Sequence, residues 1–134
     1  MLDRDAPIIL TCPPGYCPRP PISLGEPDTV LEDAARRIFA ELGIFSFRFV
    51  EPPMPNQDYL CLWSGAQDGI EYEVRHGEGP HTGEYPFWIW IGLQSGGYSD
   101  MLTEQAHSIA EKLRQHGWRS LVRGYISATG EMTL

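Results

Sequence analysis

The most apolar and most β-prone run in the chain is Glu84-Tyr85-Pro86-Phe87-Trp88-Ile89-Trp90-Ile91-Gly92-Leu93. Side chains two residues apart share one face of a strand, so Phe87, Ile89, Ile91 and Leu93 lie on one face and Trp88 and Trp90 on the other. Both faces are therefore apolar, as is typical of a strand inside a sheet that a helix covers on at least one side. We expect this run to form the central strand.

Amphipathic helices are predicted before and after this strand. Thr29 and Glu32 have the spacing of a capping box, and apolar residues then recur at helical intervals until Gly43. A second helix is predicted from Ser99 to His116, where apolar residues again form one stripe. Each helix therefore has one face to bury against the sheet.

Further strands are predicted from alternating or apolar runs, at Ile44 to Val50, Tyr59 to Trp63, Ile70 to Val74 and Trp118 to Ser127. Asp68-Gly69 is a turn signal before the third of the five strands. This order, α-β-β-β-β-α-β, predicts an α+β two-layer sandwich with a mainly antiparallel sheet of about five strands and both helices on one face. The segment from the fourth strand through the second helix to the last strand could instead form a right-handed parallel crossover.

The N-terminal part of the chain is rich in proline. Prolines at positions 13, 14, 18, 20 and 21 exclude a helix there, because proline lacks the backbone donor and clashes with the preceding turn. We therefore expect an extended arm over residues 1–27 that lies on a neighbouring subunit, followed by a single α+β domain over residues 28–134.

The chain of 134 residues has a net charge of −8, and the acidity lies in its middle. From Glu51 to Glu111 there are ten acidic residues and one basic residue. Such a surface would repel nucleic acid, which binds clustered Lys and Arg, and would attract a basic protein. The charge could instead serve solubility alone.

No apolar run is long enough to span a bilayer, so no membrane partner is expected. The first residues are acidic where a secretory signal would be basic. A cytoplasmic location is therefore predicted.

Two cysteines, Cys12 and Cys17, lie on either side of a Pro-Pro-Gly turn. They could be free thiols, a disulfide or half of a zinc site. A second close pair of ligands is missing from the sequence, so no metal is predicted. The glycine pairs lack a following Walker lysine, and no cofactor is predicted either.

A possible acid-base cluster consists of Glu71, Glu73, His76 and His81. Strand alternation places the two glutamates opposite the apolar residues, on what we expect to be the exposed face of an edge strand. Exposed carboxylates keep ordinary pKa values and are poor proton donors at neutral pH. We therefore predict no catalytic residues and a protein that is not an enzyme.

The order of the elements resembles that of phage tail-terminator and tail-completion proteins. The resemblance rests on the strand Phe87 to Ile91 with the helix Ser99 to His116 after it, and on the helix from Thr29 with the strand Asp58 to Trp63 after a Pro-rich loop. It covers roughly Thr29 to Ser127. It implies a small α+β subunit that assembles into a ring closing the tail tube, in the cytoplasm or in the virion.

The leading hypothesis is therefore a non-enzymatic structural subunit of a phage-like particle that binds protein partners and forms a homo-oligomer. The alternative is an acidic immunity or inhibitor protein that binds a basic toxin or enzyme, or an acidic dimer like a secretion chaperone. The interface candidates are Pro13, Pro14, Tyr16, Glu71, Glu73, Trp88, Trp90 and Tyr98.

Overall fold

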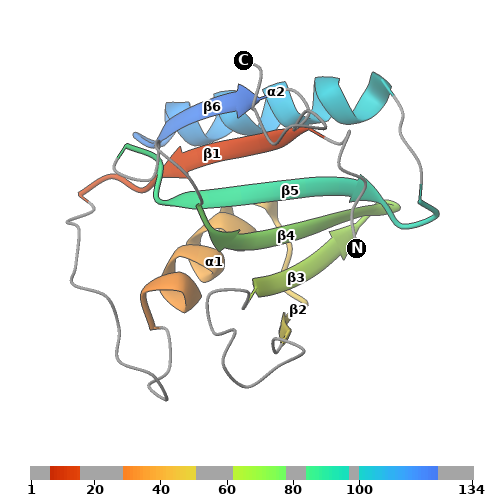
Figure 1. Ribbon diagram of the computed structural model, residues 1–134, viewed down its shortest axis with the longest axis horizontal. Coiled ribbons are helices and arrows are strands. Elements are labelled where there is room, and N and C mark those ends of the chain that lie inside the picture. The colour runs from red at the N-terminus through yellow and green to blue at the C-terminus, as the bar shows by residue number, and fades with distance from the viewer. Residues whose placement is uncertain (1–6, 16–28, 51–61, 78–83, 97–99, 124–134) are drawn as a thin grey trace, which may run out of the picture.

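The computed structural model describes residues 7–15, 29–50, 62–77, 84–96 and 100–123. The elements are β1 (Ile8–Cys12), α1 (Thr29–Leu42), β2 (Phe47–Val50), β3 (Leu62–Gln67), β4 (Ile70–His76), β5 (Phe87–Leu93), α2 (Asp100–Gln115) and β6 (Arg119–Arg123) (Figure 1). The strands form one sheet in the order β2-β3-β4-β5-β1-β6. Every pairing between neighbours in this order is antiparallel. The α+β class and the mainly antiparallel sheet with two helices are thus confirmed.

The strand β5 lies inside the sheet, between β4 and β1. Phe87, Ile89 and Ile91 pack into the main core together with residues of both helices, so α1 and α2 cover the same face of the sheet. Trp88 packs on the opposite face with Ile8 of β1. The prediction of an interior strand with two apolar faces is therefore confirmed.

The prediction of an extended N-terminal arm is wrong for Ile8–Cys12. Ile8–Cys12 is a strand of the sheet that pairs with β5 on one side and with β6 on the other. These residues lie between Pro7 and Pro13, so every one of them keeps the backbone donor that a paired strand needs. The described sheet consequently has six strands where about five were expected, and residues 16–27 of the predicted arm lie outside the described ranges.

The connection from β5 through α2 to β6 relates two strands that run in the same direction. Both strands are antiparallel to β1, which lies between them, so they are parallel to each other without being neighbours. The crossover considered from the sequence therefore does join two parallel strands. These strands are not neighbours, because β1 lies between them. The strand β1 thus fills the place between β5 and β6 and pairs with both.

The turn between β3 and β4 has the conformation that its sequence predicts. Asp68 and Gly69 have φ angles of 54° and 80°. Positive φ at both central residues is the requirement of a type I′ hairpin turn, which Asp-Gly satisfies well. The turn fixes the register of the hairpin, in which Gln67 lies opposite Ile70.

The main core lies between the helices and the sheet. Its fully buried side chains include Ile38 and Phe39 of α1 and Leu102 and Leu113 of α2. Gly65 of β3 allows close packing here, because a Cβ atom at this position would lie 3.0 Å from Phe39. No helix in the described ranges is long and apolar enough to cross a membrane.

Candidate interaction surfaces

The sheet face opposite the helices, here called the outer face, carries aromatic and charged side chains. Trp90 of β5 lies opposite Glu73 of β4 on one side and opposite Ile8 of β1 on the other. Ile8 in turn lies opposite Arg123 of β6. Paired residues share a face, so one row crosses four strands from a carboxylate through an indole and an apolar residue to a guanidinium.

The expected exposure of Glu73 is wrong. Glu73 is only 7% exposed, and its carboxylate accepts a hydrogen bond from the guanidinium of Arg75. This guanidinium lies 4.7 Å from the centroid of the Trp90 ring. Alternation along the strand places Glu73 on the outer face as predicted, but there Arg75 pairs with its carboxylate and Trp90 lies beside it.

The structure does not assemble the predicted acid-base cluster. Glu71 is half-buried and accepts a hydrogen bond from the Ser64 hydroxyl at 3.4 Å on the outer face. The ring of His76 stacks on Phe87, which belongs to the core on the opposite face. Within the described part of the chain, the glutamates and this histidine therefore point to opposite faces of the sheet, and His81 lies outside the described ranges.

Among the described residues, four buried nitrogen donors on the outer face have no hydrogen-bond partner. They are Arg75 Nε, Trp88 Nε1, Trp90 Nε1 and Arg123 Nε. Gly77 allows the indole of Trp88 to pack closely, since a Cβ atom there would lie 2.7 Å from its Nε1. Unpaired buried donors cost free energy, and the packing of the outer face has to offset this cost.

Arg123 is the most unusual of these residues. It is only 4% exposed, and burial lowers the pKa of its guanidinium. Its neighbour across β1, Trp90, offers no acceptor atom. Among the described residues no carboxylate forms an ion pair with it.

Cys12 is a free, buried thiol, so the disulfide considered from the sequence does not form. Its sulfur accepts a hydrogen bond from Arg119 of β6 at 3.3 Å. This hydrogen bond raises the pKa of Arg119. Cys17 lies outside the described ranges, and within those ranges no group of three or more His, Cys, Asp or Glu side chains could hold a metal ion.

The predicted interface candidates fall into three groups. Pro13, Glu73 and Trp88 are buried within the chain, whereas Pro14 is exposed and Trp90 and Glu71 are half-buried. Tyr16 and Tyr98 lie outside the described ranges. The structure brings Trp88, Trp90 and Glu73 together on the outer face, and Pro14 lies at the end of β1 against Gly117.

A second surface, which we did not predict, lies at the β2 edge of the sheet. We call Phe47, Phe49 and Trp63 the edge aromatic cluster, and Phe45 lies two residues before it in the chain. Phe45 is 86% exposed and Phe49 42% exposed, although the sequence pattern predicts a half-buried strand with its phenylalanines inward. Large apolar side chains in a group on a surface are typical of a protein-protein contact.

The edge aromatic cluster is held in place from the core side. Phe47 stacks on Phe39 of α1 with ring centroids 4.8 Å apart, and Phe49 lies 5.6 Å from Trp63. The guanidinium of Arg36 lies 5.6 Å from the rings of both Phe47 and Trp63. Phe47 and Trp63 thus hold the exposed ring of Phe49 in place.

One signal in the sequence could have located this edge. Three prolines, at positions 52, 53 and 55, directly follow β2. Proline is confined to the edges of sheets, so a short strand that runs into several prolines is an edge strand. Phenylalanines in such a strand have a partner strand on one side only.

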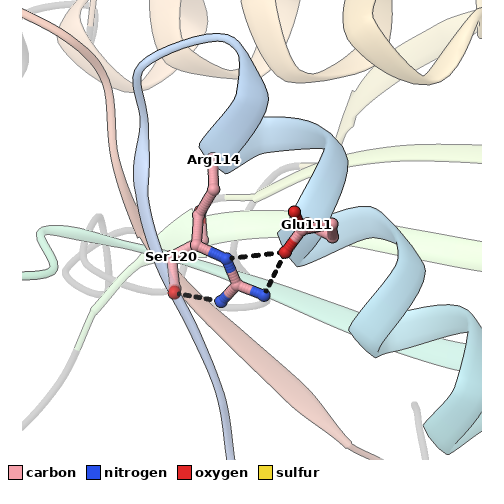
Figure 2. Close-up of polar contacts among 3 residues, drawn as sticks. All are labelled: Glu111, Arg114 and Ser120. Atoms are coloured by element: carbon pink, nitrogen blue, oxygen red, sulfur yellow. Dashed lines mark hydrogen bonds and ion pairs between the residues drawn. The ribbon is translucent and has the colours of Figure 1, made fainter.

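At the other edge of the sheet, an arginine side chain binds the backbone of β6. Arg114 of α2 donates a hydrogen bond from its guanidinium to the backbone oxygen of Ser120 at 2.9 Å (Figure 2). Its Nε and second terminal nitrogen donate to the carboxylate of Glu111 at 3.3 and 3.0 Å. The guanidinium is thereby fixed in place beside the strand.

Comparison with protein-family models, with curated proteins and with solved structures finds no match to this chain.

Tyr72 gives folding stability a pH dependence that can be measured. Burial raises the pKa of its phenol above the ordinary value of about 10, and a hydrogen bond from Gln105 at 3.3 Å partly opposes this shift. Above about pH 10 the unfolded chain loses the phenol proton while the folded chain keeps it, so stability falls as pH rises. We expect the free energy of unfolding in urea to drop between about pH 8 and pH 10.5, and to drop less in Tyr72→Phe. An equal drop in both proteins would contradict this role of Tyr72.

Proposed function

We infer that the chain is a non-enzymatic interaction protein that associates with other protein subunits through the β2 edge. The observation that carries this proposal is the exposure of Phe45 and Phe49 beside an edge strand. An edge strand has unpaired backbone groups and is a template for pairing with another chain. Among the described residues nothing pairs with the outer side of β2.

The size of this surface indicates a reversible association. A phenylalanine side chain has about 200 Å² of surface. At their exposed fractions, Phe45 and Phe49 together present roughly 250 Å² of apolar area to solvent. A stable interface buries about 800 Å² on each partner. We therefore expect an affinity in the micromolar range, with assembly at high local concentration.

A structural subunit of a phage-like particle fits this behaviour, because such subunits assemble where many copies meet. The proposal of a tail-terminator-like ring keeps its basis in the order of the elements. The alternative of an acidic inhibitor has less support from the structure, since burial removes Glu73 from the acidic surface and half-buries Glu71.

We expect the wild-type protein to show a mass that rises with concentration in size-exclusion chromatography with light scattering. The double variant Phe45→Ser/Phe49→Ser loses the exposed aromatic area and should stay monomeric over the same range. Met101→Ser is the matched control, because Met101 is also an exposed apolar residue but lies on α2.

A wild-type protein that stays monomeric at every concentration, and that binds no partner, would overturn the proposed role. Equal association by the double variant and the wild type would place the contact elsewhere on the molecule. Thermal unfolding of each variant checks that the substitutions leave the fold intact.

A further inference from the structure

We propose that Arg123 of β6 forms a binding site for a small carboxylate ion on the outer face of the sheet. The site lies on the strand at the opposite end of the sheet from β2. It is therefore separate from the contact proposed for the β2 edge, and either can exist without the other.

The guanidinium of Arg123 is a buried charge without a counter-charge in the described part of the chain. The residue is only 4% exposed, and its Nε has no hydrogen-bond partner. Burial lowers its pKa, and no neighbouring charge among the described residues opposes this shift. Arginine stays protonated in proteins, so loss of the proton cannot relieve the cost of burial. Buried charges are paired as a rule, and here a negative partner is missing.

The tip of this guanidinium remains accessible to a small ion. The enclosed donors without partners include Nε of Arg123 but neither of its terminal nitrogens. Within the described ranges these two nitrogens also form no ion pair or hydrogen bond, so they keep some contact with solvent. The terminal nitrogens carry the fork of N–H groups that binds oxyanions.

The neighbours of Arg123 in its row of the sheet add a second donor. Ile8 lies opposite Arg123, and Trp90 lies opposite Ile8 on the other side. The indole Nε1 of Trp90 is enclosed and has no hydrogen-bond partner among the described residues. The carboxylate of Glu73, at the far end of the row, accepts a hydrogen bond from Arg75. Within this row, an anion at Arg123 therefore meets N–H donors and an apolar side chain but no competing free carboxylate.

The site favours a planar ion with a single negative charge. A carboxylate offers two oxygens in one plane to the parallel N–H groups of a guanidinium. One guanidinium balances one negative charge, whereas a phosphate dianion would bring a second charge into surroundings that are nearly closed to water. The low exposure of Arg123 also favours a small ion. We therefore name the ligand class as small monocarboxylates, with acetate as the probe.

Arg123 costs stability in the free protein, as residues of binding sites often do. Its guanidinium is unpaired until a carboxylate binds, and binding then supplies the missing partner. Arg119, on the same strand, differs in this respect because it is exposed and donates a hydrogen bond to the sulfur of Cys12. Arg119 is therefore the matched control for Arg123.

A titration with acetate tests the site. At constant ionic strength, with acetate replacing chloride, we expect a saturable shift of the Nε–H resonance of Arg123 and a rise in the urea midpoint of unfolding. Recognition of one small ion by one guanidinium predicts a Kd on the order of millimolar. The midpoint of Arg119→Met should rise as in the wild type, and that of Arg123→Met should not respond. Arg123→Lys keeps the charge without the planar fork and should need about tenfold more acetate for the same rise.

Three results would overturn the proposal. A midpoint that is the same in acetate and in chloride would show that the guanidinium takes no carboxylate. An acetate response that persists in Arg123→Met would place any binding elsewhere on the molecule. A stronger response to inorganic phosphate than to acetate at equal ionic strength would contradict the ligand class. Thermal unfolding without added ligand checks that each variant is folded.

Discussion

Replacing Ile9 by alanine is expected to lower the free energy of unfolding by about 2–5 kcal/mol. Ile9 is fully buried in the main core, and its strand pairs with both β5 and β6. The substitution removes methyl and methylene groups from a packed site and leaves a cavity that the flanking strands cannot close without shifting. A loss of this size is a large fraction of the total stability of a small domain.

This expectation separates a strand of the sheet from an extended arm. An arm lying on a neighbouring subunit would lose almost nothing in the isolated chain when Ile9 is shortened. Urea unfolding at low protein concentration measures the effect, with Gln67→Ala as the control, because Gln67 is exposed in β3 and should change stability by less than about 0.5 kcal/mol. If both variants unfold at the wild-type midpoint, β1 does not contribute to the core.

Replacing Arg123 by methionine is expected to raise the free energy of unfolding by about 1–3 kcal/mol. The guanidinium is buried, its Nε has no hydrogen-bond partner and burial lowers its pKa. Folding therefore removes a charge from water without an acceptor among the described residues. Methionine retains the length and the apolar contacts of the arginine stem and does not carry this cost.

The measurement is the urea midpoint of Arg123→Met against that of Arg119→Met on the same strand. Arg119 is exposed, so its substitution should change stability little. A destabilised Arg123→Met protein would mean that the guanidinium is bound in the folded protein. In that case Arg123→Lys, which keeps the charge but not the planar fork, should also be destabilised.

Local sequence patterns predict much of this fold. Apolar alternation places Phe87, Ile89 and Ile91 on the core side of β5, and the helical spacing of apolar residues locates α1 and α2. Asp68-Gly69 marks the hairpin turn because few other residue pairs adopt positive φ at both positions. Each of these features depends on residues that are close in sequence.

The features that the sequence does not predict depend on contacts between distant segments. Ile8–Cys12 becomes a strand only because β5 and β6 supply its partners, and its prolines on both sides suggest a loop. Glu73 has the pattern of an exposed position, yet its carboxylate pairs with Arg75, whose guanidinium lies against the ring of Trp90. The exposure of Phe49 follows from the place of β2 at an edge, for which the prolines after the strand are the one signal in the sequence.

The position of β1 also decides when the sheet can be completed during folding. Thr11 and Ser120, which form a hydrogen bond between neighbouring strands, are 109 residues apart in the chain. Pairings between distant residues form late, because the intervening chain must first lose much of its freedom. On the ribosome β1 emerges before β5 and β6, and Ile8, Ile9 and Leu10 stay exposed until these two strands are available. Slow refolding and a need for chaperone protection of this apolar segment are the expected consequences of its place between β5 and β6.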